Sequence, residues 1–306
     1  MRIAVMGTGG VGGYFGAKLA AAGLDVTFVA RGAHLAALRE RGLTIESGVS
    51  PLQLKPVQAT DNPASIGPVD AVMFCVKLWD VEAAAAQVAP MVQTGGVVIP
   101  FQNGLEAPEV LERVLGPARV LGGVAYIAAT IKAPGMIAHT GTMARLRVGA
   151  FPGGPTACAA QFAGACAAAG IDVELATDIR RALWEKFCFL SALSGCTSVA
   201  RQPVGTIRGD PDLRATFEAA VREAWSVGRA QGVPLADDFV AAQMRALDAL
   251  PAEMRSSMQN DLAGGRRLEA PWLSGAVASL AKHAGLAAPV SGVLYAALKP
   301  YVAGTA

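Results

Sequence analysis

The chain has 306 residues, which is enough for one large domain or two domains of ordinary size. It is 53% hydrophobic and only 16% charged, and its net charge is +2, so we expect neither a nucleic acid nor an acidic membrane as a partner. No apolar run is long enough to span a membrane. Because the glycines between Gly7 and Gly16 interrupt the apolar stretch that a signal peptide needs, we expect a cytoplasmic protein.

The five cysteines and three histidines form no cluster in the sequence. No two cysteines are spaced as a C-x-x-C pair, and the histidines are scattered. We therefore expect buried thiols in a reducing compartment and no bound metal.

The first half of the chain alternates short apolar runs with helical patterns. This alternation is typical of βαβ units around a parallel sheet, and it predicts an α/β fold. The predicted strands are 2–6, 26–30, 43–46, 71–76, 97–100 and 120–126. The predicted helices are 11–22, 34–41, 81–92 and 108–114, with Gly23 and Gly42 ending the first two. Further strands near 136–139 and 144–149 are predicted to be antiparallel or peripheral.

Helical patterns take over from Asp178 onward. The predicted helices are 179–198, 213–230, 237–250, 272–284 and 290–301. We place a domain boundary between Ala176 and Thr177, so that residues 1–176 form the α/β domain and residues 177–306 form an all-helical domain. Several of these helices are apolar on more than one face, which favours a homodimer without requiring one.

A glycine-rich stretch, GTGGVG, lies directly after the first strand and directly before the first helix. Gly7, Gly9 and Gly12 have the spacing of a dinucleotide-binding loop, in which they permit a tight turn, a close ligand approach and close helix packing, respectively. The N-terminus of the helix supplies N–H groups for the phosphates. The residues expected to bind the cofactor are Gly7, Thr8, Gly9, Gly10, Val11 and Gly12. The alternative is a purely structural turn.

The end of the second predicted strand indicates which dinucleotide to expect. An NAD-binding fold usually has a carboxylate there, which binds the ribose 2′-hydroxyl. Here the strand ends at Ala30, and Arg31 follows, whose guanidinium can pair with a 2′-phosphate. We therefore expect NADP as the cofactor, with His34 or Arg39 as additional phosphate contacts. The alternative is a solvated surface arginine.

Two polar motifs follow predicted strands at the edge where open α/β sheets bind ligands. Lys77 follows the strand 71–76, and Asn103 follows the strand 97–100 within a Gln-Asn-Gly motif. Lys77 can bind a carboxylate or a hydroxyl, and Asn103 can hydrogen-bond the nicotinamide ribose or a substrate oxygen. The structural alternatives are a solvated strand end and an Asn-Gly turn.

Lys186 lies in a largely apolar predicted helix, where it shares one face with Leu190 and Ser194 at four-residue spacing. Burial disfavours the charged form of a lysine and lowers its pKa, which makes it a competent general acid near neutral pH. Such a lysine can protonate a ketone oxygen while a hydride is added to the carbon. The structural alternative is a lysine that extends its ammonium group to solvent.

A further polar segment runs from Ser256 and Ser257 to Glu269. Serines that precede a helix are common N-caps. Glu269 can be a surface charge paired with Arg266, three residues earlier. The spacing alone assigns a catalytic role to neither the serines nor the glutamate.

Together these segments resemble the ketopantoate reductase (2-dehydropantoate 2-reductase) family over nearly the whole chain. The resemblance rests on GTGGVGGYFGAKLAAAG, VKLWD, PFQNGLE, WEKF, GDPDL and SSMQNDLAGGRRLE. It implies a Rossmann-type domain joined to a helical domain. It also implies NADPH-dependent reduction of a 2-keto acid to a 2-hydroxy acid, nominally ketopantoate to pantoate in pantothenate biosynthesis.

The resemblance further implies roles for individual residues. Lys186 would be the general acid, Asn103 would bind both cofactor and substrate, and Lys77 would line the active site. Ser257 would bind the substrate carboxylate, and Glu269 would contact the distal hydroxyl of the substrate or Lys186.

Three positions of the predicted substrate site depart from the family pattern. Leu190, Ser194 and Met254 stand where family members usually carry asparagines. A buried polar group that loses its partner costs about 1–3 kcal/mol. Three functions therefore remain open: a ketopantoate reductase, a family reductase or dehydrogenase for a more apolar acid, and an NADPH-binding sensor without turnover. The retained lysine, asparagine and glutamate argue against the sensor, which needs none of them.

Overall fold

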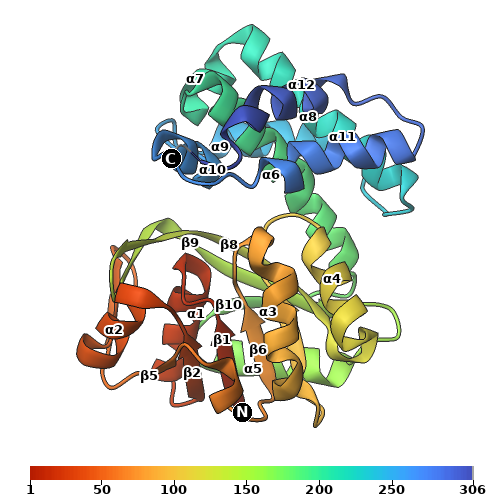
Figure 1. Ribbon diagram of the computed structural model, residues 1–306. Coiled ribbons are helices and arrows are strands. Elements are labelled where there is room, and N and C mark those ends of the chain that lie inside the picture. Colours follow the sequence, from red (N-terminus) through yellow and green to blue (C-terminus); the bar gives the residue numbers. More distant parts are fainter. Residues whose placement is uncertain (305–306) are drawn as a thin grey trace. The chain divides into compact units, whose positions relative to one another are not determined.

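The computed structural model describes residues 1–304, and its residue contacts divide the chain into two units (Figure 1). Unit 1 comprises Met1–Gln102 and Glu106–Ala182, and unit 2 comprises Asn103–Leu105 and the chain from Leu183 onward. The division falls inside helix α6 (Ile179–Ala200). The domain boundary that we place between residues 176 and 177 stays a prediction.

A five-stranded parallel sheet forms the centre of unit 1, in the order β5-β2-β1-β6-β7. Its strands are β1 (Arg2–Met6), β2 (Asp25–Val29), β5 (Gln58–Thr60), β6 (Ala71–Phe74) and β7 (Val97–Pro100). Numbered along the chain within this sheet, the order is 3-2-1-4-5, which matches five of the six strands of a Rossmann fold, in which ligands bind beyond the carboxyl ends of the strands. The chain leaves β1 at this edge through the glycine loop.

The helices of unit 1 are α1 (Gly10–Ala21), α2 (Gly32–Arg41), α3 (Val81–Val88), α4 (Glu106–Leu115) and α5 (Thr156–Ala168). Helices α1, α2 and α4 confirm the predicted helices to within two residues, whereas the predicted helix 81–92 comprises α3 and the 3-10 helix η3 (Ala89–Val92) that follows it. Helix α5 was missed because its sequence is almost uniformly small and apolar, so it has no periodic contrast between two faces. Gly23 and Gly42 have positive φ angles directly beyond α1 and α2, as predicted for helix ends.

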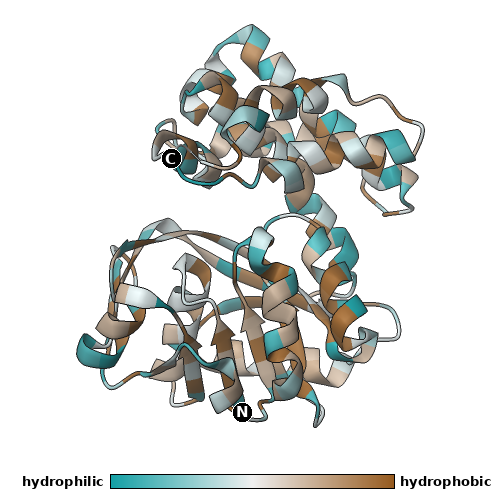
Figure 2. Cartoon of the chain, viewed as in Figure 1, coloured by the Kyte–Doolittle hydropathy of each residue, from teal (hydrophilic) through white to brown (hydrophobic). Residues whose placement is uncertain are grey.

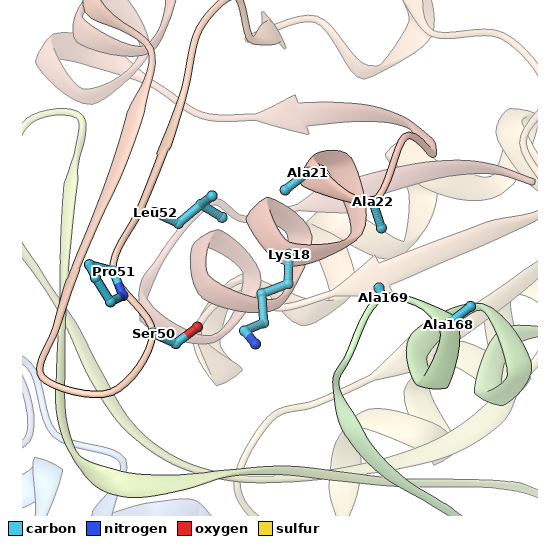
Figure 3. A pocket seen from close by; sticks show the side chains of 8 residues that line it. All are labelled: Lys18, Ala21, Ala22, Ser50, Pro51, Leu52, Ala168 and Ala169. Carbon is cyan, nitrogen blue, oxygen red and sulfur yellow. The ribbon is translucent and has the colours of Figure 1, made fainter.

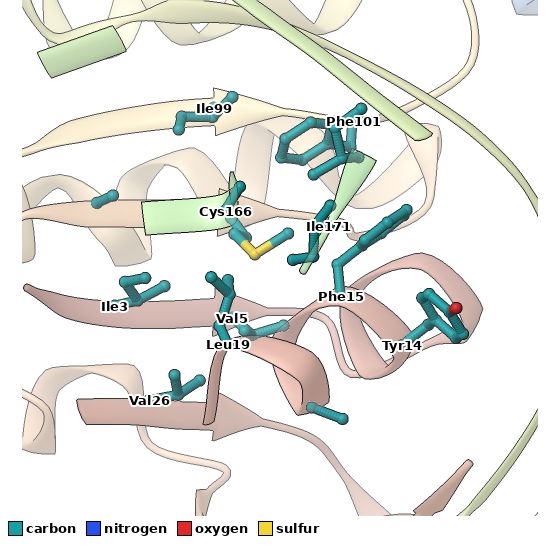
Figure 4. Packing of buried hydrophobic residues seen from close by; sticks show 14 of the residues in the cluster. Ile3, Val5, Tyr14, Phe15, Leu19, Val26, Ile99, Phe101, Cys166 and Ile171 are labelled. Carbon is teal, nitrogen blue, oxygen red and sulfur yellow. The ribbon is translucent and has the colours of Figure 1, made fainter. Parts of the chain in front are cut away.

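Continuous apolar sequence explains why the parallel sheet is buried on both faces. All four residues of β6 and of β7 are buried. Figure 4 shows Phe15 and Leu19 of α1 and Cys166 of α5 beside Ile3 and Val5 of β1. Figure 2 shows the central strands largely in brown and much of α2 in teal, as expected for a core strand and a solvated helix.

Two strands predicted for the parallel sheet belong to a second sheet instead. They are β3 (Leu43–Ser47) and β8 (Leu121–Ala133), and the other members are β4 (Leu52–Leu54), β9 (Met136–Ala150) and β10 (Asp172–Leu175). The sheet order is β10-β9-β3-β4, and β8 pairs with β9. A tight turn at Gly135 joins β8 to β9 and enforces antiparallel pairing between them.

The burial pattern of β3 gives the physical reason for this correction. Leu43 and Ile45 are buried, whereas Glu46 is exposed, which is the alternation of a strand with one covered face. The strands predicted at 136–139 and 144–149 form the single strand β9. Strand β9 is antiparallel to β8, as predicted, but parallel to β3 and β10.

Among the residues that the structure describes, unit 2 consists of helices joined by turns and loops, without a strand. Besides α6, its helices are α7 (Val204–Gly209), α8 (Pro211–Ala230), α9 (Phe239–Ala249), α10 (Ser257–Ala263), α11 (Ser274–His283) and α12 (Pro289–Leu298). Unit 2 has its own hydrophobic core, with Phe187 of α6 and Phe217 and Val221 of α8 at its centre. The predicted fold class, a Rossmann-type α/β part followed by an all-helical part, is confirmed. None of the helices formed by residues 1–304 has the length and apolarity needed to cross a membrane.

Candidate active site

The glycine loop has the geometry that dinucleotide binding requires. Gly7 has a φ of +99°, a left-handed conformation that favours glycine. A Cβ atom on Gly12 would overlap the carbonyl oxygen of Gly7, so Gly12 permits the close packing of α1 on the turn. A Cβ atom on Gly9, in contrast, would meet nothing within 4 Å. The loop therefore leaves open space at Gly9, where a ligand can approach the backbone.

The surroundings of the loop also suit a phosphate chain. Thr8 ties the loop to the end of β2, because both its N and its Oγ1 donate to the Val29 carbonyl oxygen, at 3.1 and 2.9 Å. Gly9, the N-cap of α1, has no side chain that could cap the helix, so the first N–H groups of α1 are available to an anion. Arg31 is exposed two residues after the end of β2 and is the N-cap of α2. These features fit a nicotinamide dinucleotide.

Gly10 has a packing role within unit 1. A Cβ atom there would overlap the carbonyl oxygen of Ala129 in β8. The backbone of α1 therefore lies directly against the second sheet at this point. Cofactor binding by the residues of the loop, Gly10 and Val11 included, stays a prediction.

The two additional phosphate contacts that we considered make other interactions. Arg39 Nε donates to the Ala59 carbonyl oxygen at 3.1 Å, and Arg39 Nη2 lies 3.5 Å from Asp61 Oδ1. His34 Nδ1 accepts a hydrogen bond from Gly135 N at 3.1 Å. Burial lowers the pKa of His34 below its ordinary value, so the ring is neutral at pH 7 and carries no charge for a phosphate.

Lys77 and Gln102 follow β6 and β7 at the carboxyl edge of the parallel sheet. Lys77 is exposed, and its Nζ lies 5.5 Å from the centroid of the Trp79 ring. Gln102 Nε2 donates to the carbonyl oxygens of Phe74 and Val76, at 3.1 and 3.0 Å, so it braces the ends of the two strands. Sequence reasoning gave Gln102 no role, although a polar side chain directly after a buried strand is the signal that could have revealed one.

The three predicted catalytic residues meet within unit 2, although they come from distant segments of the chain. Lys186 Nζ donates to Asn103 Oδ1 at 2.9 Å, and Asn103 Nδ2 lies 3.5 Å from Glu269 Oε2. Lys186 and Asn103 are half-buried, and Glu269 is 8% exposed. The geometry thus joins an ammonium group, an amide and a carboxylate in one network.

Gly104 explains how Asn103 can approach Glu269. Its φ is +91°, and a Cβ atom there would lie 3.1 Å from the Trp272 carbonyl oxygen. Trp272 ends the short 3-10 helix η5 (Ala270–Trp272), which directly follows Glu269. The glycine lets the backbone beside Asn103 lie close to the turn that carries the glutamate.

The environment of Lys186 adjusts its acidity. Burial lowers the pKa of Lys186 to about 8, although the carboxylate of Glu269 raises it. An amine with this pKa can both donate and accept a proton near neutral pH. The surface-charge alternative for Glu269 is wrong, because the carboxylate is buried and Arg266 Nε donates to Asp261 Oδ1 at 2.7 Å.

Residues predicted to contact the substrate differ widely in exposure. Leu190 and Met254 are half-buried and pack against the core of unit 2. Ser257 is exposed at the start of α10. Ser194 is only 1% exposed, and its Oγ has no hydrogen-bond partner among the residues that the structure describes. Ser194 is therefore enclosed by the surrounding core, although helical spacing alone places it on the same face as Lys186.

The N-cap of α10 is Ser256 and not its neighbour. Ser256 Oγ accepts a hydrogen bond from Gln259 N at 3.0 Å and lies 2.8 Å from Thr197 Oγ1 of α6. Thr197 Oγ1 in turn donates to the Leu193 carbonyl oxygen at 2.7 Å. The predicted serine cap is confirmed, and it fastens the start of α10 to α6.

A surface depression of about 260 Å³ lies elsewhere in unit 1 (Figure 3). Its lining residues are Lys18, Ala21, Ala22, Ser50, Pro51, Leu52, Ala168 and Ala169. It lies at the C-terminal end of α1, away from the glycine loop, and contains none of the predicted site residues. Within residues 1–304, no group of histidine, cysteine, aspartate and glutamate side chains is arranged to hold a metal ion.

Comparison with known proteins agrees with this architecture. The family model described as ketopantoate reductase PanE/ApbA matches residues 3–153, and the model of its C-terminal part matches residues 178–302. The 2-dehydropantoate 2-reductase of Halobacterium salinarum is 32% identical over 292 residues, covering 95% of each chain.

Solved structures show the same fold. A PanE/ApbA family ketopantoate reductase from Ralstonia eutropha superposes with a TM-score of 0.90 at 32% identity, covering 99% of this chain and 98% of its own. A D-mandelate dehydrogenase solved with NADH and anilino(oxo)acetate reaches a TM-score of 0.91, covering 99% and 98% of the two chains. At 18% identity, this second match shows the fold alone. From the two family models and the close relatives, the chain belongs to the ketopantoate reductase family of oxidoreductases.

Proposed function

We propose that the protein is an NADPH-dependent reductase that converts a 2-keto acid to a 2-hydroxy acid, with Lys186 as the general acid. The observation that carries this proposal is the network of Lys186, Asn103 and Glu269. In this network a lysine of lowered pKa donates a hydrogen bond to an amide, and the amide lies beside a carboxylate. Ketopantoate is the nominal substrate, because the family and its curated relatives are named for that reaction.

Lys186, Asn103 and Glu269 have different roles in the proton transfer. A bound nicotinamide dinucleotide supplies the hydride that is added to the keto carbon. Lys186 Nζ donates a proton to the keto oxygen as negative charge develops there, and it recovers a proton from water afterwards. Asn103 Oδ1 accepts one N–H of the ammonium group and thereby orients the other two. Glu269 favours the charged, proton-donating form of the lysine.

The proton-donor role predicts a definite pH dependence. Reduction needs protonated Lys186, whose pKa is about 8, so kcat/KM for reduction should be constant below that pH and fall as pH rises through it. Oxidation of the 2-hydroxy acid needs the neutral amine, so its rate should rise over the same range. Steady-state rates in both directions from pH 6 to about 10 test this. A reduction rate that stays flat through pH 8 would contradict the role of Lys186.

The preference for NADPH is proposed from Arg31, which is exposed two residues after the end of β2. Arg31→Ala should raise the Kd of NADPH by about 10- to 100-fold, the value of one charged hydrogen bond, and leave the Kd of NADH nearly unchanged. Fluorescence titration of both cofactors measures this. Arg39→Ala is the matched control, because this arginine of α2, the helix that Arg31 caps, already binds Ala59 and Asp61. An equal increase in the Kd of both cofactors would show that Arg31 does not bind the 2′-phosphate.

A second candidate function is a family reductase or dehydrogenase for a more apolar acid. The observation in its favour is the surface of α6 next to Lys186, where Leu190 is half-buried and apolar and Ser194 is enclosed in the core. Met254 adds a third position without a strong hydrogen-bonding group. A substrate hydroxyl near these side chains would be left without a partner, at a cost of about 1–3 kcal/mol.

Rates with a panel of acids separate the two candidates. For the second one, kcat/KM should be about 10- to 100-fold higher with aliphatic or aromatic 2-keto acids than with ketopantoate. A clear preference for ketopantoate would instead establish the nominal substrate and show that the three substitutions are tolerated.

The remaining proposals concern turnover, the metabolic pathway, the cellular location and the oligomeric state of the protein. A sensor without turnover is disfavoured, because it would need no network around Lys186. A role in pantothenate biosynthesis follows only if ketopantoate is the substrate. A cytoplasmic location and a homodimer stay predictions, and the exposure of Val293 (67%) and Leu286 (38%) in unit 2 supports the latter.

A further inference from the structure

Glu269 lies at the end of an irregular stretch of unit 2. Residues 264–268, between α10 and η5, belong to no helix or strand. Beyond Glu269 the chain is fixed by η5, where Trp272 N donates to the Glu269 carbonyl oxygen at 3.0 Å. On the preceding side no regular secondary structure holds the backbone, so the position of the carboxylate depends on individual contacts. Near α10 the stretch is held by Gly265 N and Arg266 N, which donate to carbonyl oxygens of α10 at 3.1 and 2.8 Å.

The segment Lys299–Gly304, named here the 299–304 segment, supplies the backbone hydrogen bond nearest to Glu269 on the preceding side. Leu268 is fully buried, and its N donates to the Val302 carbonyl oxygen at 3.0 Å. Gly304 has a φ of +82°, and a Cβ atom there would lie 2.8 Å from the Gly265 carbonyl oxygen. The half-buried side chain of Val302 packs against the core of unit 2. Backbone therefore lies directly against backbone over the residues that lead into Glu269.

We propose that the 299–304 segment is a positioning element that holds the carboxylate of Glu269 against Asn103 and beside the ammonium group of Lys186. The inference rests on the proposed function, since it assigns the segment a role in proton transfer. The contact between Asn103 and Glu269 is already 3.5 Å long, at the limit of a hydrogen bond, so a small displacement of the backbone breaks it.

The charged groups around Lys186 make the effect measurable. Glu269 faces it from the turn before η5, and Glu185 is its neighbour on α6. Asp261 and Arg266, on the chain that leads to Glu269, form an ion pair with each other. Because Glu269 raises the pKa of Lys186, a displaced carboxylate leaves burial unopposed, and the pKa of the lysine falls.

The test compares two glycine substitutions in the full-length protein. Gly304→Ala forces the 299–304 segment away from Gly265, whereas Gly285→Ala introduces a similar left-handed strain, with φ of +69°, at a position where a Cβ atom would meet nothing within 4 Å. The readout is the pH dependence of trace acetylation of Lys186 by acetic anhydride, followed by mass spectrometry. We expect the midpoint to fall by roughly 0.5–1 unit in Gly304→Ala, part of the shift that an opposite charge can produce. In Gly285→Ala it should equal the wild-type value.

A double variant shows whether the effect passes through the carboxylate. In a Glu269→Gln background, Gly304→Ala should cause no further shift. A wild-type midpoint in folded Gly304→Ala, or an equal shift in the Glu269→Gln background, would overturn the proposal. If Gly304→Ala does not fold, Val302→Ala replaces it, because it loosens the same segment. The same lower midpoint of Lys186 acetylation is then expected, and a wild-type midpoint would overturn the proposal. The labelling needs no turnover, so a protein that reduces no 2-keto acid would refute the proposed function and still test this inference.

Discussion

Replacement of Lys186 by alanine is expected to lower kcat for reduction by about 100- to 10,000-fold, the usual contribution of a positioned general acid. The Kd of NADPH should stay within about twofold of the wild type, because the cofactor loop and Arg31 lie in unit 1 and Lys186 lies in unit 2. Steady-state rates at saturating substrate and a fluorescence titration of NADPH measure the two quantities separately.

The matched control for this variant is Lys282→Ala. Lys282 is an exposed lysine of α11 in the same unit, and its loss should change neither rate nor affinity. If Lys186→Ala retains wild-type turnover, Lys186 has only a structural role, and the acid must be sought elsewhere. A joint loss of turnover and NADPH affinity would indicate disturbed folding, which thermal unfolding would reveal.

The second large effect concerns the glycine loop, where two substitutions of similar size should act in opposite ways. Gly9 has an extended backbone, with φ of −84° and ψ of −160°, and a Cβ atom there meets nothing within 4 Å. Gly9→Val should therefore leave the stability of the protein within about 0.5 kcal/mol of the wild type. The new side chain fills the open space that we propose for the phosphates, so the Kd of NADPH should rise by about 100-fold or more, on the order of 3 kcal/mol.

In Gly12→Val, in contrast to Gly9→Val, the loss of stability should be larger than the loss of NADPH affinity. A Cβ atom at Gly12 overlaps the Gly7 carbonyl oxygen and lies 2.8 Å from Val5 Cγ1, so overpacking should cost about 1–3 kcal/mol of unfolding free energy. Thermal unfolding without cofactor and NADPH titration together test the contrast. Wild-type NADPH affinity in Gly9→Val would show that the open space at Gly9 is not the phosphate site.

Local rules explain why parts of the site could be predicted from the sequence. The glycine loop obeys constraints of backbone conformation and packing that act within a dozen residues, and Gly7, Gly9 and Gly12 show each of them separately. Lys186 was recognisable because a charge in an apolar helix is conspicuous. The network joins Lys186 to Asn103 across 83 residues and Asn103 to Glu269 across 166 residues, and only the family resemblance suggested it.

Features that depend on long-range packing could not be predicted in this way. Strand β3 follows α2 as a Rossmann strand would, but it pairs with β4 and β9, which lie outside the parallel sheet. Ser194 has the helical spacing of a site residue, yet the surrounding core encloses it. Helix spacing determines which side chains share a face, whereas other elements of the fold determine whether that face is accessible.

The most direct test of the central claim is the oxidation of NADPH by the purified protein on addition of ketopantoate or another 2-keto acid, with the 2-hydroxy acid identified as the product. The account predicts that NADPH is consumed in proportion to the product formed, and that Lys186→Ala forms almost none. If the protein binds NADPH but none of the 2-keto acids tested causes its oxidation, the proposed reductase function is contradicted.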